Sequence, residues 1–225
     1  MKLSQMLNKN KMTLIVSLPQ NRTELAEAAV RGGADALKVH ANVFHQASGN
    51  RFGSVYEQRE VFKELLDSFE VPIGLVPGAQ VCASQDELKL AEQLGFSFLS
   101  VFVFHMPLYM LETKMDKMLA INESYDTAHL KVLNKLDVDI IEADVFSDDK
   151  REKIHVSDLL RFGRIVESVD KPVVVPTQRI IEPDEVKFLY KLGIKGIMIG
   201  AIVTGSSPDS IERITRQFRQ AIDSL

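Results

Sequence analysis

Three charged residues interrupt apolar runs of this sequence. Lys38 lies in ADALKVH, and Glu142 and Asp144 lie two residues apart in VDIIEADVF. Lysine and carboxylate side chains are rarely buried unless they are paired, because an isolated charge removed from water is very unfavourable. These residue types therefore indicate either catalytic groups or a structural ion pair inside the fold.

The chemistry that such residues can perform is acid–base or Schiff-base chemistry. A lysine held away from water can act as a base or a nucleophile, and two carboxylates at i and i+2 can move a proton or hold a cation. We therefore predict Lys38, Glu142 and Asp144 as catalytic residues. We predict no cofactor: a metal site built from His40, Glu142 and Asp144 is the weaker alternative, because no ligand spacing supports it.

A second group of polar and glycine residues lies near the C-terminus. Gln178 and Arg179 follow the apolar run PVVVPT, and Gly200 and Ala201 lie in the run GIMIGAIV. Loops after the last two strands of an α/β barrel frequently bind phosphate, because free N–H groups concentrate partial positive charge there. We predict that these four residues bind a phosphate. The alternative is ordinary loop polarity before a final helix capped by Ser207.

Apolar runs and helical segments alternate through the whole chain. The pattern of a glycine that ends a helix and an apolar strand recurs as GGADALKV, LGFSFLSV and LGIKGIMI. Alternating strands and helices imply a parallel sheet, and eight units of similar length favour closure into a single (β/α)8 TIM barrel. The predicted strands are residues 12–18, 34–40, 73–76, 96–104, 117–123, 138–146, 173–176 and 196–203.

Length and composition agree with one barrel domain spanning residues 1–225. The chain has 225 residues, of which 45% are apolar and 26% charged, so it can bury a large core. A net charge of -4 gives no electrostatic reason to expect nucleic acid or an anionic membrane as a partner. We find no signal peptide and no membrane span, and we expect a soluble cytoplasmic protein. The sequence is compatible with a monomer and with a homo-oligomer.

Residues 41–53 form the longest polar connection, on the face where barrels place their active sites. We predict that His40 and Asn42 bind substrate under this loop; the alternative is a solvated loop. Two capping boxes are also predicted, one beginning at Asn21 and one at Ser84. Residues 105–116 are expected to form a short helix.

The C-terminal half resembles the ribulose-phosphate-binding barrels, and most of all the N-acetylmannosamine-6-phosphate 2-epimerases. The similar stretches are Gln178-Arg179-Ile180, Glu182-Pro183-Asp184 and Ile199-Gly200-Ala201-Ile202. Upstream, LIVSLPQ, GGADALKVHAN and VPIGLV resemble the corresponding strand segments of that family. The resemblance covers nearly the whole chain and implies a TIM barrel with a phosphate site.

The acid–base residues of the epimerases are absent from this sequence. The family's lysine falls at Val76-Pro77, its strand-four aspartate at Phe102, its strand-seven glutamate at Pro176-Thr177, and its strand-two arginine at His40. The resemblance therefore implies the fold and the phosphate site but not the epimerase reaction.

The resemblance also suggests which side chains face the barrel interior. If His40 takes the inward place, Lys38 faces inward as well, because side chains alternate along a strand. The same alternation turns Glu142 and Asp144 inward, and Asn122 from the preceding strand. Lys38 is then expected to pair with one of the two carboxylates, and Asn122 and His40 to orient substrate hydroxyls.

We expect an enzyme that acts on a small phosphorylated metabolite, a sugar phosphate, as an isomerase, epimerase or lyase. The absence of the epimerase residues supports an alternative, a non-catalytic barrel that binds a phosphate ligand or regulates. The phenylalanine-rich strand over residues 96–104 suggests a third possibility, transfer of a prenyl or other lipid phosphate.

Overall fold

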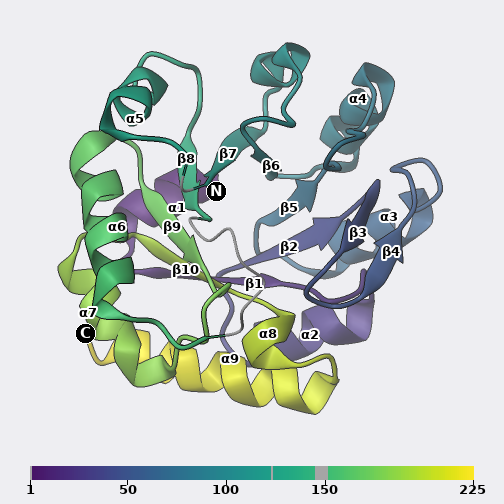
Figure 1. Cartoon of the computed structure of the whole chain (residues 1–225). Coiled ribbons are helices and arrows are strands. Elements are labelled where there is room, and N and C mark those ends of the chain that lie inside the picture. The colour runs from purple at the N-terminus through teal and green to yellow at the C-terminus, as the bar shows by residue number, and fades with distance from the viewer. Residues whose placement is uncertain (1, 123, 145–151) are drawn as a thin grey trace.

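Eight parallel strands close into a barrel in the computed structural model, which describes residues 2–122, 124–144 and 152–225 (Figure 1). Neighbours around the barrel follow the order β1-β10-β9-β8-β7-β6-β5-β2, in which β2 pairs with β1 and closes the ring. This closed parallel sheet with helices between its strands confirms the predicted (β/α)8 TIM barrel. Its strands are β1 (Thr13–Ser17), β2 (Ala36–His40), β5 (Ile73–Val76), β6 (Phe98–Phe102), β7 (Asp116–Ile121), β8 (Ile140–Ala143), β9 (Val173–Pro176) and β10 (Gly196–Ile199).

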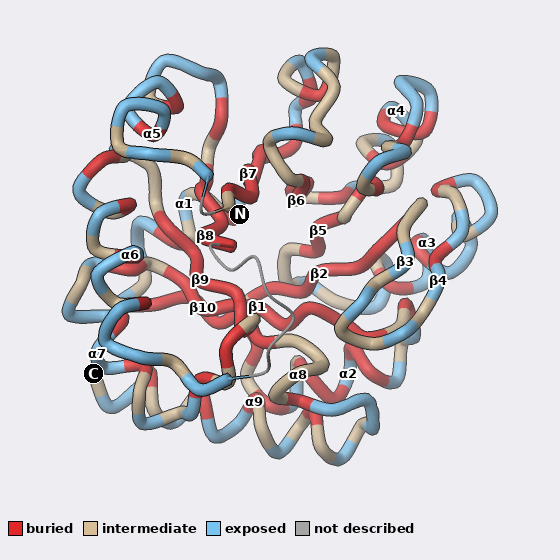
Figure 2. The backbone as a smooth tube through the Cα atoms, in the orientation of Figure 1, coloured by how far each residue is buried: buried red, intermediate tan, exposed pale blue. Residues whose placement is uncertain are grey.

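Helices surround the barrel, with buried inner faces and exposed outer faces (Figure 2). Among the described residues, no helix is both long and apolar enough to span a bilayer. The helical segments are α1 (Leu3–Lys9), α2 (Thr23–Arg31), α3 (Arg59–Ser68), α4 (Gln85–Leu94), η1 (Leu108–Glu112), α5 (Thr127–Leu133), α6 (Val156–Ser168), η2 (Pro183–Glu185), α7 (Val186–Lys191), α8 (Ala201–Thr204) and α9 (Pro208–Asp223).

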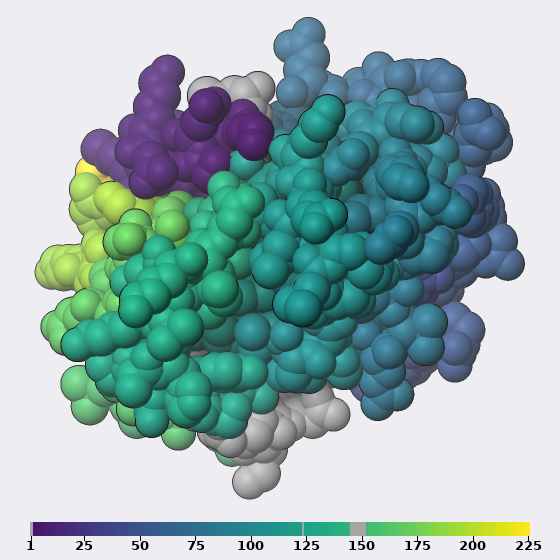
Figure 3. Space-filling view, turned by 90° about the horizontal axis from the view of Figure 1, so that it is seen from above, coloured from purple at the N-terminus to yellow at the C-terminus, as the bar shows by residue number. Residues whose placement is uncertain are grey.

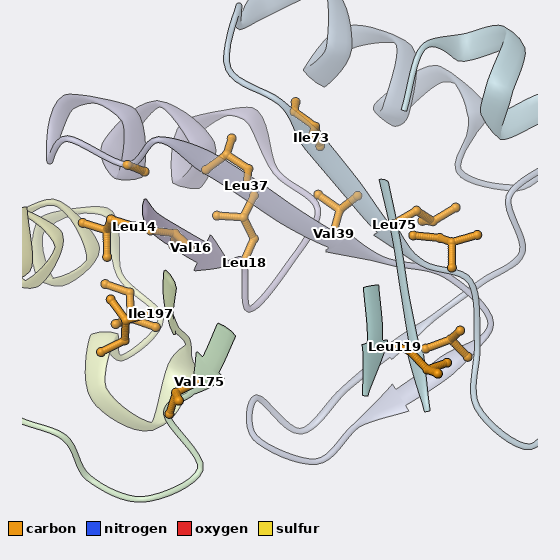
Figure 4. Close-up of a cluster of buried hydrophobic side chains, with 14 of the residues drawn as sticks. Leu14, Val16, Leu18, Leu37, Val39, Ile73, Leu75, Leu119, Val175 and Ile197 are labelled. Carbon is orange, nitrogen blue, oxygen red and sulfur yellow. The ribbon is translucent and has the colours of Figure 1, made fainter. Parts of the chain in front are cut away.

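Two hydrophobic clusters lie on the two sides of the strands. Outward-facing residues such as Leu37, Val39 and Ile197 pack beneath the helices (Figure 4). The inner cluster fills the barrel with Ile15, Ala36, Phe98, Met118, Ile140, Val174 and Met198. Gly74 leaves the space that the Phe98 ring occupies, since a Cβ there would lie 2.2 Å from that ring. The lower part of the barrel is thus a packed core.

The N-terminal helix α1 closes the end of the barrel at which the strands begin. Leu3 and Leu7 are fully buried and belong to the inner cluster. Asp116, at the start of β7, accepts a hydrogen bond from the Ser4 N–H at 2.8 Å and pairs with Lys2 at 3.1 Å. In Figure 3 this purple N-terminal segment packs against the surface of the molecule. This helix was not predicted from the sequence.

The connection after β2 is a β-hairpin, whereas the sequence predicted only a polar loop there. Strands β3 (Val43–His45) and β4 (Asn50–Phe52) pair antiparallel and fold over the end of β2. The predicted capping box at Asn21 is wrong, since α2 has Arg22 at its N-cap and no side-chain cap. Asn21 instead hydrogen bonds with both the N–H and the carbonyl of His40.

Two further local predictions have definite outcomes. The Ser84 capping box is present, and its Glu87 also accepts from the Val55 N–H at 3.0 Å. The helix expected over residues 105–116 is shorter, a 3-10 helix over Leu108–Glu112, and β7 already begins at Asp116.

Candidate functional site

A polar layer lies directly above the apolar filling of the barrel. Lys38 Nζ is 3.6 Å from Glu142 Oε1, and the Ser100 hydroxyl donates to Glu142 Oε2 at 2.6 Å. The two charged side chains are only 9% and 6% exposed. The predicted inward direction of Lys38 and Glu142 is confirmed, and of the two carboxylates predicted as partners of Lys38 it is Glu142 that pairs with it.

The strand order explains why these residues meet. Strands β2 and β8 are four neighbours apart in either direction around the barrel, so Lys38 and Glu142 face each other across its interior. Layers of four side chains from alternate strands are typical of this fold. The register of the strands places Ser100 of β6 and Met198 of β10 in the same layer.

A second layer forms the mouth of the barrel, two residues further along the same four strands. It consists of His40, Phe102, Asp144 and Gly200. His40 of β2 lies across the barrel from Asp144, and Phe102 of β6 lies across from Gly200. The Lys38–Glu142 pair therefore forms the floor of a site whose walls differ in chemistry.

The carboxyl group of Asp144 has a pKa close to neutral pH. Burial raises the pKa of Asp144 from 3.8 to about 7, and the neighbouring Glu142 carboxylate acts in the same direction. A hydrogen bond from Gln178 and the charge of Lys38 oppose this rise in pKa. A carboxyl group with such a pKa can both donate and accept a proton during a reaction.

The His40 side chain is buried and uncharged, and it forms part of the wall of the mouth. Its ring centroid lies 4.3 Å from that of His45 and 5.0 Å from that of Phe52, both on the hairpin. Burial lowers the pKa of His40 well below its usual value, and the pKa of His45 falls to about 4 for the same reason. Among the described residues, His40 Nδ1 has no hydrogen-bond partner.

The turn after β10 presents backbone N–H groups at the mouth. The Gly200 N–H donates to Thr177 Oγ1 at 3.1 Å. Within the described part of the chain, the N–H groups of Ala201 and Ile202 have no acceptor. A Cβ at Gly200 would meet only Ser17, at an ordinary 3.6 Å, so no protein atom packs closely against this position.

Arg179 points toward the carboxylates that precede and begin α6. Its Nη1 lies 3.3 Å from Glu152 Oε2, and its Nε lies 3.9 Å from Asp158 Oδ2. No sequence pattern pointed to these partners, because they come from a separate βα loop. Phosphate binding by Arg179 stays a prediction, and its observed contacts tie the end of β9 to α6.

The side chains of Asn42 and Asn122 form hydrogen bonds to other groups of the protein. Asn42 adopts a left-handed φ of 54°, and its amide donates to Pro77 O at 3.3 Å and Glu87 Oε1 at 3.4 Å. Asn122 Oδ1 accepts hydrogen bonds from the N–H and hydroxyl of Ser124. Substrate binding by these two residues stays a prediction.

Ser100 was not predicted as a site residue; it donates a hydrogen bond to Glu142 from β6, which is separated from β8 by one strand of the barrel. The available signal was that, of the two serines in the apolar run FSFLSVFVF, Ser100 shares the inward parity of Phe98.

No group of three or more metal-binding side chains occurs among the described residues. A groove of about 720 Å³ lies at the other end of the barrel, where Lys2, Pro72, Gly95 and Lys114 line it. It is separated from Lys38 and Glu142 by the apolar layers and has no part in this site.

No protein-family model and no curated protein matches the chain, whereas solved structures do match it. A thiamine phosphate pyrophosphorylase from Pyrococcus furiosus has a TM-score of 0.69 at 18% identity, over 96% of this chain and 97% of that one. A Mycobacterium tuberculosis tryptophan synthase has a TM-score of 0.78 at 12% identity, over 98% of each chain. A tryptophan synthase α-subunit from Pyrococcus furiosus has a TM-score of 0.74 at 13% identity, over 94% of this chain and 99% of that one. At these identities the likeness shows the fold alone.

Proposed function

We propose that this barrel is an enzyme acting on a small phosphorylated substrate, a sugar phosphate, as an isomerase, epimerase or lyase. The observation that carries the proposal is the Lys38–Glu142 pair, buried at the floor of the mouth with Asp144 above it. A purely structural ion pair would leave unexplained why a second buried carboxyl group, that of Asp144, lies beside it.

The three side chains suit proton transfer at a carbon next to a carbonyl group. Asp144 in its carboxylate form removes the proton, and the electron pair moves onto the carbonyl oxygen as an enolate. The Lys38 ammonium stabilises that negative charge, and protonated Asp144 then returns the proton to a carbon. Glu142, held by Ser100, keeps Lys38 in position.

The phosphate group of the substrate is assigned to the turn after β10. Gly200 leaves space there, and the N–H groups of Ala201 and Ile202 provide two donors. One structural neighbour is by name an enzyme of thiamine phosphate, which supports a phosphorylated substrate.

A thermal-shift screen of sugar phosphates, inorganic phosphate and unphosphorylated sugars tests this assignment. A ligand that binds only the folded protein raises its melting temperature. We expect Gly200→Ala to weaken phosphosugar binding about tenfold, because the added methyl group would crowd the phosphate at the turn. Gly163→Ala, on α6 away from the mouth, is the matched control and should bind as the wild type does.

Two outcomes would overturn parts of the proposal. If no phosphorylated compound stabilises the wild type, the phosphorylated substrate is excluded for the compounds tested and the assignment of the turn is wrong. If phosphosugars bind at the Gly200 turn but no compound that binds is converted, the barrel is the non-catalytic binding protein of the alternative hypothesis.

A further inference from the structure

Three aromatic side chains line one side of the mouth and have no role in the proton transfer described above. We call Phe102, Phe104 and His105 the aromatic wall. The Phe102 and Phe104 rings are stacked, with centroids 5.1 Å apart and an angle of 22° between them. The His105 ring lies 4.5 Å from Phe104. Phe104 is 53% exposed, so its ring is accessible to a ligand.

The wall stands across the barrel from the predicted phosphate turn. Phe102 is two residues beyond Ser100 on β6, so both side chains point into the barrel. Strands β6 and β10 are four neighbours apart in either direction, which places Phe102 opposite Gly200.

The mouth is therefore divided into two halves. Strands β2, β5 and β6 are consecutive in the barrel and present the neutral His40, Val76 and Phe102. Strands β8, β9 and β10 present Asp144, the polar end of β9 and the Gly200 turn. A ligand that spans the mouth meets hydrogen-bonding groups at one end and apolar rings at the other.

We propose that the phosphorylated substrate carries a planar, apolar group at the end opposite its phosphate, and that this group packs on Phe102 and Phe104. The proposal rests on the proposed function and narrows its substrate class to phosphosugars with such a substituent. The reacting carbon then lies between the two ends, above the Lys38–Glu142 floor.

Two physical arguments favour a planar group at this wall. Sugar hydroxyls packed on phenylalanine rings would lose hydrogen bonds to water without replacing them. The two rings are stacked at an angle of only 22°, and a further planar ring extends such a stack more favourably than a flexible chain does.

Calorimetric titration with three phosphate monoesters of equal charge tests the proposal: propyl, hexyl and phenylpropyl phosphate. We expect the wild type to bind the phenylpropyl ester about five- to tenfold more tightly than either alkyl ester, the range that aromatic packing provides. Phe102→Leu keeps an apolar side chain without the ring, and Phe104→Ala removes an exposed ring. Both variants should lose this preference while their affinity for propyl phosphate stays unchanged.

Phe188→Ala is the control, because Phe188 is an exposed phenylalanine on α7, away from the mouth. It should retain the full preference. Equal affinities of the wild type for the three esters, or a preference that survives in Phe102→Leu, would overturn the proposal and leave the proposed function standing. If no ester and no inorganic phosphate binds the wild type, the proposed function falls, and the substrate class inferred here falls with it.

Discussion

Lys38 and Glu142 occupy a layer of the barrel that branched apolar side chains normally fill. Their pairing, with Ser100 as a further hydrogen-bond donor to the carboxylate, makes this burial tolerable. Each residue of the pair therefore depends on the other for its place in the interior.

Lys38→Met tests this dependence. The variant leaves the Glu142 carboxylate buried without its cation, and we expect the free energy of unfolding to fall by about 3–5 kcal/mol. The double variant Lys38→Met/Glu142→Gln has no buried charge at this place and should recover most of that loss. Chemical denaturation of the wild type and both variants measures the effect. Equal stability of the single and double variants would argue against a coupled ion pair.

Asp144 gives the stability a pH dependence with a definite sign. Its pKa in the folded protein is about 7, above the ordinary 3.8, so folding favours the protonated form. This stabilising contribution is fully present below about pH 4 and is lost as the pH rises through about 7. We therefore expect Asp144→Asn, which stays neutral, to gain stability relative to the wild type between these pH values.

Denaturation of both proteins at several pH values from about 4 to about 8 checks this prediction, since groups common to the two proteins cancel in the comparison. Parallel stability curves for wild type and Asp144→Asn would show that Asp144 is not held in its protonated form.

At the residue scale, alternation along strands predicted that Lys38 and Glu142 face inward once the family resemblance had given His40 its inward place, and it left Glu142 and Asp144 as alternative partners of Lys38. The contacts of Asn42 and Arg179 were not predictable, because Glu87, Glu152 and Asp158 come from other βα units. Short-range patterns carry no information on such partners.

At the scale of elements, α1 is the part of the fold that does not belong to the βα repeat. It buries Leu3 and Leu7 against the lowest layer of the barrel, and Asp116 holds its first turn. Gly196 leaves room for this helix, since a Cβ there would lie 2.7 Å from Leu7. The helix therefore acts as a plug for the barrel.

Leu7→Ala tests the plug. Removing a fully buried leucine leaves a cavity at the base of the barrel, and we expect stability to fall by about 2–5 kcal/mol. Leu108→Ala is the control, because Leu108 is 81% exposed, and it should change stability by less than about 0.5 kcal/mol. Similar melting temperatures for Leu7→Ala and wild type would mean that α1 contributes little to the barrel.

The sequence pattern predicted the eight strands well because buried parallel strands are short apolar runs between helices. It failed where polar segments adopt regular structure for tertiary reasons. The β3–β4 hairpin is such a segment, since it covers His40 with Phe52 and His45. Asn21 is another, because its side chain hydrogen bonds with the backbone of His40 and does not cap α2.

At the scale of the whole molecule, closure of the barrel brings together residues that lie far apart in the sequence. Lys38 and Glu142 meet across its interior, while Phe102 and Gly200 stand on opposite sides of its mouth. The fold thus separates a packed base, an ionic floor and a mouth with one apolar and one polar half. The substrate-binding and catalytic assignments follow from this arrangement of layers.

The most direct test of the central claim is solvent hydrogen exchange at a substrate carbon. Phosphosugars that raise the melting temperature are incubated in D2O with the wild type, Asp144→Asn or Phe188→Ala, and deuterium is measured by mass spectrometry. The account predicts carbon-bound deuterium with the wild type and Phe188→Ala, and a rate lowered about 100-fold or more in Asp144→Asn. Deuterium incorporation at the same rate in Asp144→Asn, or none with the wild type for any ligand that binds, would contradict it.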